Sequence, residues 1–213
     1  MDTPTRVARA LVPTALAALL AAGCASGPPR AEDYVAPQPG VVAEYVSTSS
    51  GSFGNGVAKL PVRVEALTFE GRPAQSFANP GLSTVLTPQA GLIAVLDATG
   101  RVVMRYDPPL GMRWPLELGK TWTGRHVLTL GSGAKAPMTT TWAVEAYEKV
   151  TVPAGTFDAW RVTMTDSFGF RQTTWSVPSR MGMYAKRVSE RPAGHPQGAG
   201  VQTLELSRVP ARP

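Results

Sequence analysis

The sequence predicts an all-β domain with a single curved antiparallel sheet, half-barrel or sandwich-like, after a signal peptide and a flexible tether. Three observations predict this fold. Short apolar and β-branched runs alternate with clusters of Gly, Pro and Asp from residue 41 onward. No stretch of useful length has the periodicity of a helix. Within several runs apolar and polar side chains alternate, which is typical of strands with one buried face.

An export signal is predicted at the start of the chain, over residues 1–23. Arg6 and Arg9 form a basic segment, and an uncharged stretch rich in Ala and Leu follows over residues 10–22. This stretch contains Pro13 and is shorter than the ~20 apolar residues that cross a bilayer. A permanent transmembrane helix is therefore the weaker interpretation.

The signal ends in Leu20-Ala-Ala-Gly-Cys24, with small residues before the expected cut and a cysteine after it. This motif resembles the lipobox of bacterial lipoproteins. The resemblance implies that the Cys24 thiol takes a diacylglyceryl group and its freed amine a further acyl chain, such as palmitate. Two or three such chains, at ~0.8 kcal/mol per buried CH₂, anchor a protein permanently. The alternative is an ordinary secreted protein whose only cysteine falls here by chance.

The residues after Cys24 indicate which membrane holds the anchor. Lipoproteins kept at the inner membrane often resemble one another in having Asp at this place, whereas this chain has Ala25 and Ser26. We therefore expect an outer-membrane anchor facing the periplasm, with inner-membrane retention and cell-surface display left open. A chain with a single cysteine forms no internal disulfide, so the domain is expected to be stable through its core alone.

A lipidated flexible tether is expected over residues 24–40, because this segment is rich in Pro and has little to bury. An extended chain of this kind, at ~3.1 Å per residue, holds a domain up to ~50 Å from the bilayer. The all-β periplasmic domain is predicted to cover residues 41–213.

Twelve strands are predicted in that domain, separated by turn residues. They span Val41–Ser47, Val57–Phe69, Pro73–Ala78, Leu82–Thr87, Leu92–Leu96, Arg101–Tyr106, Thr121–Leu130, Met138–Val150, Ala159–Asp166, Phe170–Val177, Met183–Glu190 and Val201–Arg208. Three connections, Glu70–Pro73, Asp97–Gly100 and Pro153–Thr156, have the composition of tight turns. Neighbouring strands are therefore expected to pair as antiparallel hairpins, with Gly155 at positive φ.

Alternation in the second half predicts which side chains are buried. Those expected to share an inner face are Trp160, Val162 and Met164, then Trp142 with Val144, and Leu204 with Leu206. Arg161 and Thr163 are expected on the other face. Phe157 is expected to pack in the core beneath the Gly155 turn, and Trp122 and Trp175 to pack in the core as well, because isolated aromatic residues in strands usually do so.

Three segments stand out in the second half of the chain. They are Pro115-Leu-Glu-Leu-Gly-Lys-Thr-Trp122, Val152-Pro-Ala-Gly-Thr-Phe-Asp-Ala-Trp160 and Trp175-Ser-Val-Pro-Ser-Arg-Met-Gly182. In order and spacing they resemble a group of uncharacterised exported bacterial proteins, sometimes described as TapB-like. The resemblance implies an all-β fold and no known activity. In architecture, the expected sheet is similar to half-barrel lipoprotein carriers, which wrap acyl chains.

Residues that could carry enzymatic chemistry are few. Only His126 and His195 are available as a base for a nucleophile, and no Gly-x-Ser-x-Gly motif occurs. Glu145, Asp158 and Asp166 could supply a carboxylate pair for glycoside cleavage if they converge in space. Because fifteen acidic residues produce such pairs by chance, we expect no enzyme.

Metal and phosphate sites are also not expected. The spaced Cys and His pairs of a zinc site are missing. Met112, Met181 and Met183 could bind a soft metal, but methionines packing in a core are the more common case. The segment Gly51–Gly56 lacks the Lys-Ser/Thr of a phosphate loop and is interpreted as a mobile hairpin tip. No cofactor is therefore predicted.

The net charge is basic, and such a surface would attract anionic lipid headgroups, acidic polysaccharide or acidic proteins. The chain carries 21 Lys and Arg against 15 Asp and Glu, a net charge of +6. Six basic residues are concentrated in the C-terminal half: Arg161, Arg171, Arg180, Lys186, Arg187 and Arg191. A solvated strand face explains most of them, and an exported chain is a poor candidate for nucleic acid.

Taken together, these features favour a membrane-anchored, non-enzymatic domain that binds a hydrophobic ligand or an envelope partner. A structural or accessory subunit of an envelope complex is the alternative, and an unrecognised enzyme is the third. A hollow concave side would favour the ligand-binding domain, and a filled one the subunit.

Overall fold

The computed structural model describes residues 29–178 and 182–209, and over these residues the chain forms 14 strands and no helix. The predicted signal peptide and Cys24 lie outside the described residues. The strands are β1 (Arg30–Ala31), β2 (Val42–Gly51), β3 (Gly56–Phe69), β4 (Arg72–Ala78), β5 (Leu82–Leu86), β6 (Leu92–Asp97), β7 (Val102–Leu110), β8 (Leu116–Glu117), β9 (Thr121–Leu130), β10 (Lys135–Val152), β11 (Gly155–Asp166), β12 (Arg171–Val177), β13 (Met183–Arg191) and β14 (Gly200–Arg208).

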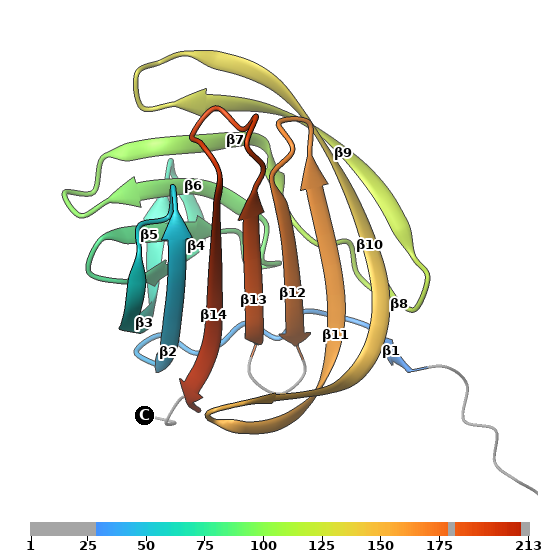
Figure 1. The fold of residues 1–213 in the computed structure, drawn as a ribbon. Helices are drawn as coiled ribbons and strands as arrows, with labels where there is room; N and C mark the ends of the chain where they lie inside the picture. The colour runs from blue at the N-terminus through green and yellow to red at the C-terminus, as the bar shows by residue number, and fades with distance from the viewer. Residues whose placement is uncertain (1–28, 179–181, 210–213) are drawn as a thin grey trace, which may run out of the picture.

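Twelve of these strands form one closed barrel in the order β10-β11-β12-β13-β14-β2-β3-β4-β5-β6-β7-β9 (Figure 1). All pairs are antiparallel, and most link neighbours in the chain. Closure comes from β14, which pairs with β2 from Gly200 opposite Gly51 to Arg208 opposite Glu44. The all-β prediction is confirmed, but the open half-barrel or sandwich is wrong. Pairing the first and last long strands removes two exposed edges, which an open sheet would leave unpaired.

The predicted strands all occur, at slightly different ends, and the sequence missed only the short β1 and β8 among the described residues. These two strands pair with each other outside the barrel sheet, through Arg30 opposite Glu117 and Ala31 opposite Leu116. Arg30 also forms ion pairs of 3.0 Å with Glu32 and Glu117. Two-residue strands leave no alternation that a sequence pattern could detect.

The described part of the predicted tether, residues 29–40, is held against the barrel. The Gln75 side chain donates to the Pro37 carbonyl at 3.0 Å, and the Gly40 amide donates to the Val64 carbonyl at 2.7 Å. The rings of Tyr34 and Trp114 lie 6.0 Å apart. A flexible tether through residue 40 is therefore not what the structure shows, because β1, Tyr34 and Pro37 all have partners on the barrel.

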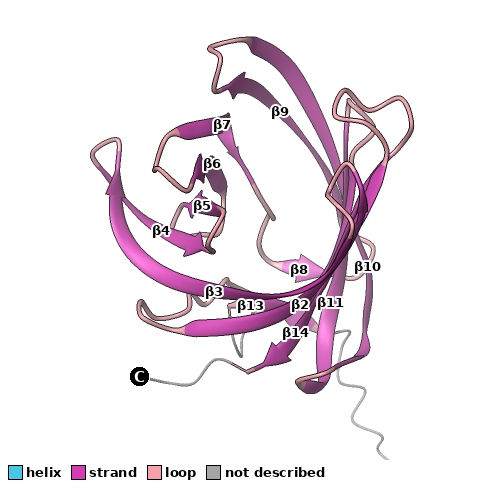
Figure 2. Ribbon diagram, turned by 60° about the vertical axis from the view of Figure 1, so that its left-hand side comes forward, coloured by secondary structure: helices cyan, strands magenta, loops and turns pink. Residues whose placement is uncertain are grey.

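The two ends of the barrel differ. At one end the tip of the β10–β11 hairpin passes beneath β14 (Figure 1), and the Ala154 amide donates to the Leu206 carbonyl at 2.9 Å. An apolar cluster that includes Tyr45, Phe157 and Leu206 lies at this end. At the other end the β9–β10 hairpin projects beyond the neighbouring strands (Figure 2). The first end is therefore filled and the second is more open.

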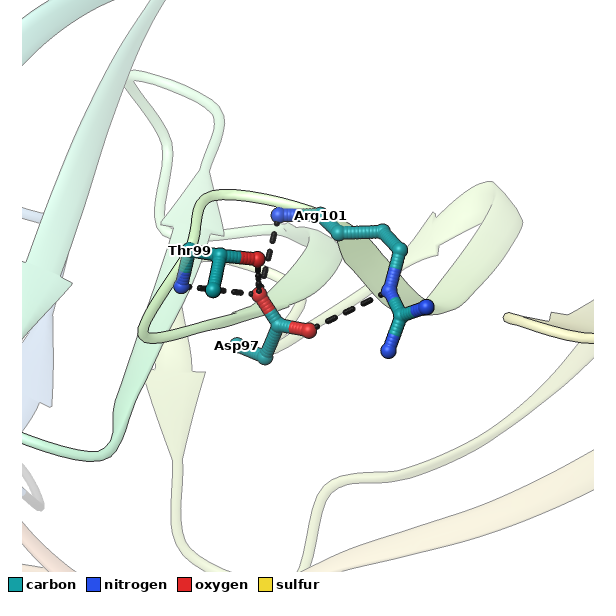
Figure 3. A network of polar contacts seen from close by, with 3 residues as sticks. All are labelled: Asp97, Thr99 and Arg101. Atoms are coloured by element: carbon teal, nitrogen blue, oxygen red, sulfur yellow. Dashed lines mark hydrogen bonds and ion pairs between the residues drawn. The ribbon is translucent and has the colours of Figure 1, made fainter.

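The β6–β7 connection is the tight turn that Asp97–Gly100 predicts (Figure 3). One oxygen of Asp97 accepts hydrogen bonds from the Thr99 amide at 2.9 Å, the Thr99 hydroxyl at 2.6 Å and the Arg101 amide at 3.0 Å. The other oxygen lies 3.2 Å from Arg101 Nε. The hydrogen bond from the Thr99 hydroxyl is the main reason that the pKa of Asp97 is lowered. This carboxylate therefore acts as a local turn-former.

Most side chains predicted to be buried are buried. The inner-face sets on β10, β11 and β14 are confirmed, as are Phe157 and Trp122. Trp175 differs from the prediction, because it is only half-buried and its indole donates to Glu148 at 2.9 Å, with Lys186 Nζ 5.7 Å from the ring centroid. Lys186 lies opposite Trp175 in the β12–β13 register, which places this Trp in a polar outer network.

Gly155 begins β11 with φ of 128°, as predicted for the turn after β10. A β-branched residue fits this region poorly, because its Cβ is crowded at positive φ. We expect Gly155→Val to lower the free energy of unfolding by more than ~1 kcal/mol in a urea titration followed by circular dichroism. Thr156→Val, one residue further along the same strand, is the control. A Gly155→Val protein as stable as the wild type would contradict this account of the turn.

Candidate functional site

The barrel contains a cavity of about 260 Å³ between an apolar and a polar wall, named here the inner cavity. The apolar wall includes Leu110, Trp142 and Met164. The polar wall is β12, whose Gln172, Thr174 and Ser176 lie at alternate positions and so share one face. Met164 lies opposite Gln172, which joins the two walls at the β11–β12 pair.

The polar wall continues from β12 across β13 to β14 and β2. Arg187 on β13 lies between Thr174 of β12 and Leu204 of β14, and Leu204 lies opposite Ser47 of β2. These residues therefore share the inner face of the sheet. The Gln202 side chain donates to the Ser47 hydroxyl at 3.4 Å, so this part of the wall is hydrogen-bonded within itself.

Arg187 is the one charged residue among the described residues that line the inner cavity. Its guanidinium carbon lies 4.6 Å from the Tyr184 ring centroid, but it forms no ion pair or hydrogen bond with a described residue. Lys186, its neighbour on the outer face, is paired with Glu205 at 2.7 Å. The Arg187 side chain is half-buried and its Nε is fully buried, and drawing a charge out of water without a partner is unfavourable. The sequence predicts that most basic residues of this half lie on a solvated strand face, and Arg187 differs because it faces the inner cavity.

Two more hydrogen-bond donors of the inner cavity lack a partner. Tyr34 Oη and Trp114 Nε1 are buried atoms with no acceptor within reach among the described residues. Burial raises the pKa of Tyr34, so its phenol stays a neutral O–H donor at physiological pH. Buried polar groups are normally hydrogen-bonded, and unpartnered ones in a cavity point to a ligand or water.

A second cavity of about 310 Å³, named here the mouth cavity, lies at the more open end of the barrel. The β9–β10 hairpin lines it with Leu128, Leu130 and Ala136, and the β11–β12 turn adds Phe168. Its lining is mostly apolar. This cavity therefore suits a hydrocarbon group.

A small polar group lies on one side of the mouth cavity, made of Asp166, Arg191 and His195. Burial raises the pKa of Asp166, and burial together with the nearby Arg191 charge lowers the pKa of His195. Arg191 is also held from outside, because its Nη1 lies 3.3 Å from Ser52 and its guanidinium 3.9 Å from the Phe53 ring. This contact ties the Gly51–Gly56 segment, which is the predicted hairpin tip, to the rim.

Tyr106 and Phe170 line both cavities and so form the boundary between them. Tyr106 lies on β7 and Phe170 immediately before β12. The Tyr106 hydroxyl contacts Met104 Sδ at 3.8 Å, and burial raises the pKa of Tyr106 to about 12. Aromatic side chains at a boundary can move by rotating about two dihedral angles.

His126 has a structural environment. Its Nδ1 lies 2.8 Å from the Pro108 carbonyl, which can only accept, so Nδ1 carries the proton. Nε2 then accepts from the Thr140 hydroxyl at 3.1 Å, and Thr140 accepts from the Trp142 indole at 3.0 Å. Both ring nitrogens are occupied by this chain of hydrogen bonds. A third cavity of about 360 Å³ adjoins His126, and among the described residues no hydrogen bond joins the His126 ring to another side chain that lines it.

The three carboxylates considered for glycoside cleavage have separate partners. Glu145 pairs with Arg161 at 3.2 Å, and Asp158 with Lys149 at 2.9 Å. Asp166 accepts from the backbone amides of the β11–β12 turn. The structure does not bring them together as a pair.

Metal-binding residues do not cluster in the part of the chain that the structure describes. Met112 and Met183 both line the inner cavity, while Met181 lies outside the described residues. Over residues 29–178 and 182–209, no helix has the length and apolar character needed to cross a membrane.

Sequence reasoning missed the residues that define the cavities. The sequence predicts that Tyr34 lies in a free tether and that Arg187 belongs to a set of solvated basic residues. Tyr106 and Trp114 carried no pattern that sets them apart. Only the strand register could have identified Arg187, because its neighbours in register, Thr174 and Leu204, face inward.

Comparison with known proteins gives no family model and no curated protein that matches. Among solved structures, the chain is similar to the hypothetical lipoprotein YmcC of Escherichia coli, with a TM-score of 0.42 and 11% identity, over 84% of this chain and 92% of that one. A candidate exported protein of Bacteroides fragilis with a YmcC-like fold has a TM-score of 0.39 and 11% identity, over 85% and 100%. A candidate lipoprotein of Parabacteroides distasonis has 0.37 and 10%, over 83% and 98%. Likenesses this distant carry no information on what the barrel binds.

Proposed function

We propose that this chain is a lipid-anchored envelope protein whose barrel binds a small apolar or amphiphilic molecule and catalyses no reaction. The observation that carries the proposal is the hollow interior, with an inner and a mouth cavity that share Tyr106 and Phe170. Their volumes of about 260 and 310 Å³ lie near the lower end of the ~300–1,000 Å³ typical of small-molecule sites.

The alternative functions have less support. A docking subunit would have a filled interior and a continuous apolar patch outside, whereas here the interior is hollow. A hydrolase would need a histidine beside a nucleophile, or a carboxylate pair, whereas His126 and Glu145 are engaged in structural contacts. His195 lies at the mouth cavity, but no Ser, Thr or Cys is among the described residues that line this cavity. Ligand binding instead makes use of the inner cavity and the mouth cavity.

Anchoring through Cys24 would hold this barrel close to the membrane. Because β1 begins at Arg30, an anchor at Cys24 would lie six residues before the first strand. Such a segment spans roughly 20 Å at most, compared with ~50 Å for the longer tether expected from sequence. A short tether would favour exchange of an amphiphile between the barrel and its own bilayer.

Filling the inner cavity is expected to prevent binding. We expect the full chain with Cys24→Ser to bind the neutral fluorophore N-phenyl-1-naphthylamine, which brightens in apolar sites. In Thr174→Phe, a ring would occupy the space beside the polar wall and weaken this binding by at least about tenfold. Fluorescence titration measures the change.

The matched control is Thr165→Phe, because Thr165 is an exposed residue on β11. It should bind the fluorophore as the wild type does, and circular dichroism checks that both variants fold. If no fluorophore binds to the wild-type barrel, or if Thr174→Phe binds it equally well, the proposed function is wrong.

A further inference from the structure

The inner cavity has an unbalanced set of polar groups. Of the seven buried side-chain atoms without a hydrogen-bond partner among the described residues, three belong to residues that line this cavity: Tyr34 Oη, Trp114 Nε1 and Arg187 Nε. Each of the three is a donor. Arg187 adds a positive charge, and no Asp or Glu is among the described residues that line the cavity. The missing partner is therefore an acceptor, and a negatively charged one.

The chemistry of Arg187 narrows the acceptor further. A guanidinium presents its N–H groups in a planar fork that matches the oxygens of a carboxylate or phosphate. The Tyr184 ring, 4.6 Å from the guanidinium carbon, supports one face of this group but supplies no acceptor in its plane. An oxyanion would satisfy both the charge and the geometry.

The mouth cavity indicates where the rest of the bound ligand would lie. It adjoins the inner cavity at Tyr106 and Phe170, and its lining beyond them includes Leu128, Leu130 and Phe168. An alkyl chain that starts at Arg187 would reach this apolar space by passing between the two rings. Burying such a chain is favourable because it removes apolar surface from water.

The size of the two cavities limits the number of chains. Each is near the lower end for small-molecule sites, which favours a ligand with one chain over a ligand with two. The boundary formed by Tyr106 and Phe170 also favours one narrow chain.

We infer that the barrel binds a single-chain alkyl oxyanion, with its headgroup at Arg187, Tyr34 and Trp114 in the inner cavity and its chain in the mouth cavity. This inference rests on the proposed function, which requires only that an apolar molecule enter. A free fatty acid and a single-chain alkyl phosphate share this chemistry.

The test uses the full chain with Cys24→Ser and displacement of N-phenyl-1-naphthylamine by ligands that share a ten-carbon chain. Decanoate or decyl phosphate should displace the fluorophore at concentrations about tenfold lower than decanol or decyltrimethylammonium, because a hydrogen bond to a charged group contributes that factor or more. The order of the two acids identifies carboxylate or phosphate as the preferred headgroup.

In Arg187→Met the preference for the acids should disappear, while decanol binds within about twofold of its wild-type affinity. Lys186→Met is the matched control, because it removes the same charge from the adjacent position on the outer face, where Lys186 pairs with Glu205. It should keep the preference. Tyr34→Phe removes only a hydroxyl and should reduce the preference about threefold, which tests the headgroup site even if Arg187→Met fails to fold.

Two outcomes separate this inference from the proposed function. If decanol competes as well as both acids, or if Arg187→Met and Tyr34→Phe keep the acid preference, the oxyanion headgroup is wrong and binding of an apolar molecule stands. If neither the fluorophore nor any ten-carbon ligand binds, the proposed function is wrong, and the inference falls with it.

Discussion

Replacing Trp142 with alanine is expected to lower the free energy of unfolding by about 3–5 kcal/mol, the largest loss for a single side chain in this barrel. Trp142 is 6% exposed and stacks on Trp122, with ring centroids 5.4 Å apart and an angle of 9° between the planes. Its indole also donates to Thr140, the hydroxyl that His126 accepts from. The substitution would remove packing and a hydrogen bond together. A urea titration followed by far-ultraviolet circular dichroism measures the change.

Two variants separate these contributions. Trp142→Phe keeps an aromatic ring against Trp122 and loses the bond to Thr140, so it should lose about half as much stability as Trp142→Ala. Thr141→Ala, at the exposed position next to Trp142 on the same strand, should change stability by less than ~1 kcal/mol. A Trp142→Ala protein within ~1 kcal/mol of the wild type would show that the stacked pair does not stabilise the barrel.

The strands were predictable from the sequence because the information for each is local. Alternation of Trp160, Val162 and Met164 marks one face of β11, and Asp97–Gly100 marks a turn by its composition. In both cases neighbouring residues carry the pattern. Tight hairpins then determine most of the pairing in the barrel.

Closure of the barrel was not predictable in the same way. It depends on pairing between β2 and β14, which lie at opposite ends of the domain. Their alternation shows that each has a buried face, but an open curved sheet, a sandwich and a barrel all bury that face. Whether β14 lies beside β2 is determined by the twist of the sheet and by the length of all the strands between these two.

The candidate site was less predictable than the fold because long-range contacts define it. Tyr34 reaches the inner cavity only because β1 pairs with β8, and two residues are too few to show a strand pattern. Arg187 faces inward after an irregularity in the β12–β13 pairing near Trp175 and Ser176, which changes the register between Tyr184 and Lys186. A sequence pattern with strict alternation does not reveal such a shift.

The proposed membrane anchor gives the second large expected effect, because it rests on one side chain. Cys24→Ser is expected to abolish incorporation of labelled palmitate completely and to leave the precursor uncut by the lipoprotein signal peptidase. A serine hydroxyl would not take the diacylglyceryl group that the resemblance to a lipobox implies at Cys24. Metabolic labelling, together with the mass of the intact protein, measures both steps.

Ala25→Ser keeps Cys24 and should be labelled and cut like the wild type, so it serves as the control. Because β1 begins at Arg30, few residues would separate the proposed anchor from the barrel, and loss of its acyl chains would also remove the barrel from the bilayer surface. Each buried CH₂ contributes ~0.8 kcal/mol, so no surface contact of the barrel would replace two or three chains. A Cys24→Ser protein that matures to the same size and still fractionates with outer membranes would show that the chain is exported and held by another route.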